Sequence, residues 1–418
     1  MPGDLDASPA TVAPPVTRGG LRIAVAMGVM NLATYGFTVV AARLLGPERY
    51  GGVAAVMNLL LVVSVVALAL QATAARRISS DLAHVGQIER EVLRVSWRAA
   101  AVVGAALLVL SPLVERLLRL DSLGPAVLVA LAAIPVTAMG GQAGVLQGER
   151  RWNALGAVYV AAGLPRLVLG AALLLASPTE LMAVAAVAAG SLAPVLVGWW
   201  ALRGDRIAGA EADHHRGRAI MAEALLGSQA LLAFFALANL DLVVARHVLP
   251  AQESGLYAAG LILTKGLLFL PQFVVVVAFP SLATADQRMR ALVGSLAATV
   301  AIGTIGTLAC WWVPELALAF VGGQAYAELT GRLWLFALLG TVLAALQLLV
   351  FAVLARRGRR TGLLVWAGLV AMLVAGSTAD TLTELVVRVT AVDGVLLVGL
   401  VALSAWLVGR DRQGLSAR

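Results

Sequence analysis

The sequence has little charge, a single cysteine and a single lysine. Only 13% of its 418 residues are charged, against about 25% in soluble domains, while 61% are hydrophobic. The mean hydropathy is +0.92. So few polar side chains cannot cover a globule of this size, which excludes a water-soluble enzyme and makes lipid the expected solvent. The lone Cys310 excludes a disulfide framework and a thiolate metal site.

The apolar segments are long enough to cross a bilayer as helices, which takes roughly 20 residues each. Twelve segments qualify: about 21–42, 51–73, 96–114, 124–147, 153–175, 180–202, 223–246, 255–280, 291–313, 333–355, 362–379 and 392–408. They lack the alternating pattern of membrane β-barrel strands. The sequence therefore predicts an all-α integral membrane protein, with a polar stretch, 377–388, between its last two spans.

The basic residues predict the orientation of these spans. With the N-terminus in the cytoplasm, 22 of the 31 basic residues lie in cytoplasmic segments and seven in outer segments. Arg166 and Lys265 lie within spans. The positive-inside rule then predicts a multi-pass protein of the bacterial cytoplasmic membrane with both termini in the cytoplasm. The positive charge is thereby assigned to topology, and no nucleic-acid partner is expected.

The spans divide into two halves joined by a hydrophilic segment. We expect an N-terminal six-helix bundle over 18–202, a cytoplasmic linker over 203–222 and a C-terminal bundle over 223–409, with a disordered tail at 1–17 and a cytoplasmic tail at 410–418. Five positions repeat without a gap at an offset of 203 residues: Ala42, Arg43, Pro47, Gly52 and Ala55 match Ala245, Arg246, Pro250, Gly255 and Ala258. Six spans separate the copies, so the halves should be related by a pseudo-two-fold axis along the membrane normal. Such lobes favour a transporter over a membrane enzyme.

Two hydrophilic segments, the linker and residues 77–94, are interpreted as structural connections and not as functional sites. His214 and His215 in the linker have no third ligand at a metal-binding spacing, so a solvated linker without a metal is expected. The segment 77–94 has apolar residues at helical spacing and is interpreted as an amphipathic helix lying at the membrane surface. The sequence has no Walker motif, which excludes direct use of ATP, and no cofactor is expected.

Several motifs resemble those of one family. The run Arg43-Leu44-Leu45-Gly46-Pro47-Glu48-Arg49-Tyr50-Gly51 resembles the signature between the first two helices of polysaccharide flippases (O-antigen type, Wzx-like). These belong to the multidrug/oligosaccharidyl-lipid/polysaccharide (MOP) exporter superfamily. Weaker likenesses occur at 147–153, 239–241 and 255–259, and the resemblance covers roughly 20–360. It implies two six-helix bundles forming a V around a central cavity, and alternating-access export of lipid-linked sugars or, in another branch, of drugs.

Part of this signature has a physical explanation. Proline stops a helix and glycine accepts turn angles, so Gly46-Pro47 and Gly51-Gly52 are expected to form a tight outer turn. Arg43 is expected to anchor the first helix by reaching the phosphate headgroups.

Ionisable side chains inside a membrane are costly and generally face the bundle interior. Asp241 and Lys265 lie at similar depths on consecutive helices, which predicts an ion pair between them. That pair is either static, or functional with Asp241 exchanging a proton or sodium ion while Lys265 alternates between it and an anionic substrate. Asp393 is expected near the outer end of the last span, reaching the interface.

The remaining polar positions suggest a hydrated cavity. We expect Arg166 and Lys265 to attract the pyrophosphate of a polyprenyl-diphosphate sugar. Polar residues at helical spacing share their faces: Asn31 and Tyr35 on the first helix, Tyr159 with Arg166, and Gln272 with Lys265. Four amides, Asn31, Gln142, Asn239 and Gln272, either meet sugar hydroxyls or form hydrogen bonds between helices.

The sequence thus predicts a flippase for a lipid-linked oligosaccharide, with membrane lipids, a coupling proton or sodium ion and a polysaccharide polymerase or glycosyltransferase as partners. The alternative is a cation-coupled multidrug exporter of the same superfamily, which calls for an acidic, aromatic cavity. A membrane glycosyltransferase or ligase requires a large outer loop, and the outer loops here are short. A non-transporting scaffold is the remaining interpretation.

Overall fold

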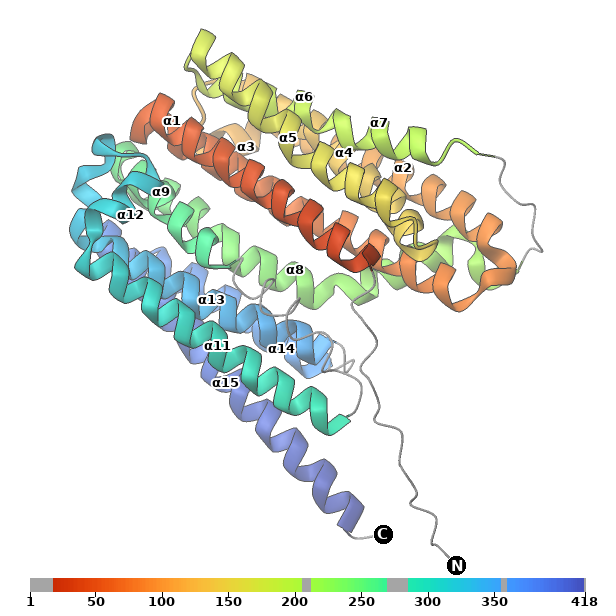
Figure 1. Ribbon diagram of the computed structural model, residues 1–418. Helices are drawn as coiled ribbons and strands as arrows, with labels where there is room; N and C mark the ends of the chain where they lie inside the picture. Colours follow the sequence, from red (N-terminus) through yellow and green to blue (C-terminus); the bar gives the residue numbers. More distant parts are fainter. Residues whose placement is uncertain (1–17, 205–211, 269–284, 355–358, 417–418) are drawn as a thin grey trace, which may run out of the picture.

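The computed structural model describes residues 18–204, 212–268, 285–354 and 359–416, and the regular structure in these ranges is helical. The helices form two bundles that lie side by side (Figure 1). The N-bundle consists of α1 (Arg18–Ser80), η1 (Leu82–His84), α2 (Val85–Val109), α3 (Ser111–Leu118), α4 (Leu123–Gly148), α5 (Trp152–Ala176), α6 (Glu180–Gly190) and α7 (Leu192–Ala201). The C-bundle follows η2 (Asp213–His215) and consists of α8 (Gly217–Val248), α9 (Ala251–Leu268), α11 (Ala285–Trp312), α12 (Pro314–Val321), η4 (Gln324–Arg332), α13 (Leu333–Leu354), α14 (Arg359–Gly376) and α15 (Leu382–Ser416).

Nine helices in the described ranges are long and apolar enough to cross a membrane. The first of them holds two of the predicted spans, because α1 bends at Gly46, where φ is 71° and ψ is 174°. Only glycine adopts such angles without strain, and Pro47 directly after it begins the next helical segment. The predicted turn at Gly46-Pro47 is therefore confirmed. Gly51 and Gly52, in contrast, are helical and take no part in the turn.

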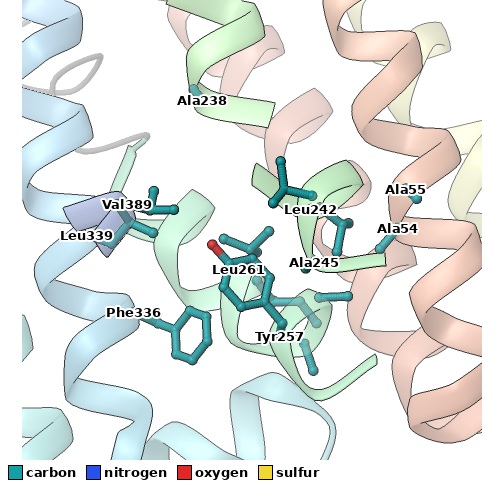
Figure 2. Close-up of a cluster of buried hydrophobic side chains, with 14 of the residues drawn as sticks. Ala54, Ala55, Ala238, Leu242, Ala245, Tyr257, Leu261, Phe336, Leu339 and Val389 are labelled. Atoms are coloured by element: carbon teal, nitrogen blue, oxygen red, sulfur yellow. The ribbon is translucent and has the colours of Figure 1, made fainter. Parts of the chain in front are cut away.

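The two bundles share one continuous apolar core. Figure 2 shows its centre, where Ala54 and Ala55 of α1 lie near Leu242 and Ala245 of α8. Tyr257 of α9 is fully buried there, and its ring meets Phe336 of α13 edge-on with 5.4 Å between centroids. Small residues on α1 and α8 allow these helices to approach closely. The helices that form this core are also the ones that enclose the central cavity described below.

Two helices begin earlier than the sequence predicts. The segment interpreted as a surface helix, 77–94, instead contains the end of α1, η1 and the start of α2. Ile88 and Val92 pack in a buried cluster with Ile78, so most of the apolar stripe faces the protein, whereas Leu82 is exposed. Similarly, α15 begins at Leu382, inside the stretch expected to be a polar loop. Its polar residues satisfy one another, since Arg388 pairs with Glu384 one turn away, while Leu385 and Val389 are buried.

Candidate functional site: a central cavity between two bundles

At one end of the molecule, which we call the signature end, residues 42–51 of the N-bundle contact the C-bundle. Arg43 Nη2 donates a hydrogen bond to the carbonyl oxygen of Ala319 in α12 (2.7 Å), and Tyr326 Oη of η4 donates one to the Ala42 carbonyl oxygen (2.8 Å). Arg43 was expected to reach lipid headgroups; its side chain is exposed, and one of its guanidinium nitrogens bonds a backbone acceptor of the opposite bundle.

A second arginine makes the corresponding contact in the opposite direction. Arg246, near the end of α8, is buried, and its Nε donates to the Leu118 carbonyl oxygen at the end of α3 (2.7 Å). Its Nη2 also donates to the Arg119 carbonyl oxygen. Arg119 in turn donates to the carbonyl oxygens of His247 (2.7 Å) and Leu249 (3.1 Å). Carbonyl groups at helix C-termini are unpaired and carry partial negative charge, so they attract guanidinium groups.

These contacts follow the internal repeat. Arg43 and Arg246 are equivalent at the offset of 203 residues, and the same offset relates α3 (Ser111–Leu118) to α12 (Pro314–Val321) at both ends. Each bundle therefore supplies one arginine of the repeat and one short acceptor helix to the other, and Arg119 adds a further contact from the N-bundle. We call this pair of contacts the arginine exchange. The sequence repeat marked the two arginines, but it held no sign that each crosses to the other bundle.

Glycines bring the two bundles into backbone contact beside the arginine exchange. A Cβ on Gly255 would overlap the Pro47 carbonyl, and a Cβ on Gly51 would lie 3.2 Å from Gly255 Cα. Arg49 Nη1 donates to the Pro178 carbonyl oxygen (3.0 Å), which fixes the turn to the start of α6, while Glu48 is exposed. The signature residues thus close this end of the molecule.

Below the signature end lies an open cavity between the bundles, with a volume of about 110 Å³ that water-sized molecules can enter. Arg166 of α5 and Lys265 of α9, one from each bundle, line the same cavity as predicted, together with Tyr35 of α1. Tyr50 of the signature also lines it, although the sequence placed this residue only in the turn. The Arg166 Nε atom is buried without a hydrogen-bond partner in the described part of the chain. An anionic ligand would supply this donor with an acceptor.

Asn58 is a cavity residue that the sequence reasoning missed. Lys265 Nζ donates a hydrogen bond to Asn58 Oδ1, and Asn58 Nδ2 donates to the backbone carbonyl oxygen of Asn239 in α8 (3.3 Å). This amide of α1 therefore ties the cavity lysine to the helix that carries Asp241. The available signal was a lone amide within the apolar run Met57-Asn58-Leu59-Leu60-Leu61.

The predicted ion pair between Asp241 and Lys265 does not form among the described residues. Asp241 is buried and its Oδ2 accepts a hydrogen bond from Tyr257 Oη (2.9 Å), while Lys265 meets Asn58. The two charged groups still interact electrostatically. Equal depth was predicted correctly, but depth alone does not determine which way each side chain points around its helix.

Asp393 of α15 is fully buried, so the expectation that it reaches the interface is wrong. Because α15 begins at Leu382, this residue lies 11 positions inside the helix, about 16 Å along its axis. It lies close enough to interact electrostatically with Asp241. Neither oxygen of Asp393, nor Oδ1 of Asp241, has a hydrogen-bond partner in the part of the chain described. The C-bundle thus contains two buried acids with three unsatisfied oxygens.

Most of the other predicted residues lie away from the cavity. Tyr159 Oη accepts a hydrogen bond from Gln71 inside the N-bundle (2.8 Å). Gln142 donates to the Val195 carbonyl oxygen (3.3 Å), and Asn239 donates to Phe235 within its own helix (2.7 Å). Asn31 is half-buried on α1, one turn from Tyr35, and is not among the lining residues. The alternative interpretation, hydrogen bonding between helices, fits Gln142, whereas the Asn239 side chain bonds within its own helix. Gln272 lies outside the described residues.

At the opposite end, which we call the linker end, two histidines contact Asp81. His84 Nδ1 lies 2.8 Å from Asp81 Oδ2, and His215 Nε2 lies 3.0 Å from the same oxygen. These hydrogen bonds hold the pKa of the Asp81 carboxyl well below its usual range. The sequence argument that His215 has no neighbouring ligands is corrected, since potential ligand atoms of Asp81, His84 and His215 lie within 4.8 Å of one another.

The hydrogen bonding of His215 nevertheless opposes a metal at this cluster. Arg77 Nη1 lies 3.3 Å from His215 Nδ1, and a guanidinium can only donate. A metal-bound histidine normally donates from its second ring nitrogen to an acceptor. We interpret the cluster as a hydrogen-bonded network that holds η2 against the end of α1. Glu223 of α8 pairs with both Arg76 and Arg77, which fastens the start of α8 to the same place.

The described helices thus form paired bundles with a cavity between them, whose largely apolar lining carries a few polar groups, Arg166, Lys265 and Asn58 among them. Comparisons with known proteins identify the family and the fold. Residues 16–280 match the family model for polysaccharide biosynthesis proteins, so the chain belongs to this family. No curated protein matches the chain. The chain is thus a multi-pass helical membrane protein of the polysaccharide biosynthesis family.

Solved MATE-family structures share the fold over nearly the whole chain. An inward-facing multidrug resistance MATE transporter of the MOP superfamily superposes with a TM-score of 0.69 at 14% identity, covering 94% of this chain and 98% of its own. The MATE multidrug transporter DinF-BH, solved as a complex, gives 0.65 at 15% identity, covering 94% of each chain. An outward-facing MATE transporter gives 0.56 at 14% identity, again covering 94% of each chain. At these identities the likeness concerns the fold alone.

Proposed function

We propose that the protein is a flippase that moves a polyprenyl-diphosphate-linked oligosaccharide across the bacterial cytoplasmic membrane by alternating access. The observation that carries this proposal is the placement of Arg166 and Lys265, one from each bundle, in a single cavity. A diphosphate concentrates negative charge, and guanidinium and ammonium groups bind it with charge-assisted hydrogen bonds. A ligand held between the bundles is released when they move apart.

The topology follows from the distribution of arginine. Most basic residues gather at the linker end, and the positive-inside rule then puts both termini and the linker in the cytoplasm. The signature end, closed by the arginine exchange, becomes the outer end. The described state is therefore closed to the outside, and the higher similarity to the inward-facing MATE structure supports this assignment. Release outside requires the arginine exchange to open.

We expect the purified protein in proteoliposomes to speed the transfer of a short-chain polyprenyl-diphosphate oligosaccharide between leaflets. The measurement is the fraction of substrate that an enzyme added outside can modify, compared with protein-free vesicles. A cationic dye offered to the same vesicles tests the drug-exporter alternative. Dye transport without oligosaccharide transfer would contradict the proposal and favour that alternative, whose cationic substrates Arg166 and Lys265 would repel.

We further propose that Asp241 and Asp393 together bind the coupling proton or sodium ion. Two carboxylates buried in one bundle repel each other unless a cation or proton joins them. Tyr257 orients Asp241, and the Coulombic contact with Lys265 links the occupancy of this acid pair to the cavity.

Asp241→Asn is expected to remove the response of transport to an imposed pH or sodium gradient. The amide keeps the size of the side chain but cannot carry the charge that a coupling ion neutralises. Transport by the variant should fall to the rate measured without a gradient, whereas Asp380→Asn, an exposed acid before α15, should behave as wild type. Equal stimulation of Asp241→Asn and wild type by both gradients would exclude Asp241 from coupling.

A further inference from the structure

A second pocket, of about 420 Å³, opens on the N-bundle at the linker end and is separate from the central cavity. One wall comes from α2, where Arg90, Arg94 and Trp97 follow one another at spacings of four and three residues and share one helix face. The lining also includes Trp199, near the end of α7, and Arg203 just after it. The pocket thus combines three arginines with two tryptophans.

The charge of this pocket is positive and its arginines are held in place. Arg94 pairs with Glu91, which also accepts a hydrogen bond from the Gly217 backbone nitrogen (3.1 Å). The Arg203 guanidinium stacks on the Trp199 ring at 3.2 Å from its centroid. The lining of the pocket includes three arginines and no acidic residue, which favours an anion. One guanidinium can donate two parallel hydrogen bonds to two oxygens of a phosphate group, and a phosphodiester offers such a pair of oxygens.

The tryptophans indicate that the anion belongs to a lipid. The exposed fractions of Trp97 and Trp199 are 48% and 52%, on the outside of a membrane-spanning bundle. Tryptophan at such positions sits at the level of the headgroups, with its ring among the upper acyl chains. Gln142 of α4 also lines the pocket. The positive-inside rule explains why arginines occur on the cytoplasmic side, but it does not explain why three of them line one pocket together with two tryptophans.

We propose that this pocket binds the headgroup of an anionic phospholipid. The phosphate lies among Arg90, Arg94 and Arg203, and the glycerol and upper acyl chains lie against Trp97 and Trp199. Basic pockets between helices at the membrane surface bind anionic headgroups by this combination of charge and apolar contact. The bound lipid fastens the end of α7 to α2. This inference does not depend on the substrate of the central cavity.

The test uses the full chain, delipidated in detergent. It is titrated separately with phosphatidylglycerol, phosphatidylcholine and soluble glycerol phosphate. Native mass spectrometry counts the molecules bound at each step. We expect phosphatidylglycerol to bind, and the double variant Arg94→Gln/Arg203→Gln to weaken it about tenfold or more. The matched control is Arg150→Gln/Arg218→Gln, which removes two exposed arginines outside the pocket and should bind as wild type.

Three results would overturn the proposal. Equal binding of phosphatidylcholine would show that charge is not recognised. Equal weakening by the control variant would assign the effect to overall charge. Displacement of the lipid by glycerol phosphate at equal concentration would assign the pocket to a soluble phosphate. Intrinsic tryptophan fluorescence, expected to shift on adding phosphatidylglycerol to wild type but not to Trp97→Leu/Trp199→Leu, verifies the location.

Discussion

Replacing both cavity cations, in Arg166→Ala/Lys265→Ala, is expected to abolish oligosaccharide transfer in proteoliposomes. Each charged donor contributes about 1.5–3 kcal/mol to binding an anion, so each single variant should lose roughly 10- to 150-fold and the double variant should match empty vesicles. The measurement is the initial transfer rate at equal protein content.

The control for this experiment is Arg332→Ala, because Arg332 is an exposed arginine of η4 outside the central cavity. It should keep the wild-type rate. Arg166→Lys and Lys265→Arg keep the charge and should keep part of the activity, which separates loss of charge from loss of packing. Wild-type transfer by the double variant would remove the cavity from the mechanism.

Gly255→Ala is expected to block transport by preventing closure at the signature end. The new methyl group would overlap the carbonyl of Pro47, a backbone atom that cannot rotate away, so the two bundles would have to separate here. In a Cys310→Ser background, a cysteine introduced by Tyr50→Cys reports this opening, because Tyr50 is buried in the described state. We expect a membrane-impermeant maleimide added from outside to label it several times faster when Gly255 is replaced.

Gly394→Ala provides the matched control, since a Cβ at this helical glycine meets no atom within 4 Å. It should leave both labelling and transport unchanged. If Gly255→Ala is labelled and transports as Gly394→Ala does, the close contact of Gly255 with Pro47 is not needed for closure.

The fold could be predicted because the bilayer simplifies the problem. Uniformly apolar runs of the required length must be helices, and Arg166 and Lys265 were conspicuous as charges within such runs. Once two bundles were expected, Arg166 and Lys265, one in each bundle, were expected to face the same cavity between them. A helix boundary that depends on side-chain pairing was harder: the polar start of α15 satisfies itself through Glu384 and Arg388, and missing it displaced Asp393 from the core to the interface.

The partners of polar side chains could not be predicted from depth and spacing. The direction of Asp241 around α8 depends on how the helices pack, and the buried Tyr257 hydroxyl satisfies it where Lys265 was expected. Asn58 was overlooked because one amide in an apolar run has no partner in the sequence itself. The arginine exchange is likewise a contact between distant segments, with 276 positions between Arg43 and Ala319.

The arginine exchange also limits where the chain can gain or lose residues. From Arg43 to the end of α3 is 75 residues, and from Arg246 to the end of α12 is again 75. The length of each interval determines where, along the bundle axis, the acceptor carbonyl groups of one half lie relative to the arginine of the other half. An insertion in one interval alone would shift one acceptor helix along the membrane normal and leave the equivalent helix of the other half in place. The two halves would then tilt relative to each other. The connection between α7 and α8 is free of this requirement, so growth or shrinkage of the chain is tolerated better there than within either copy.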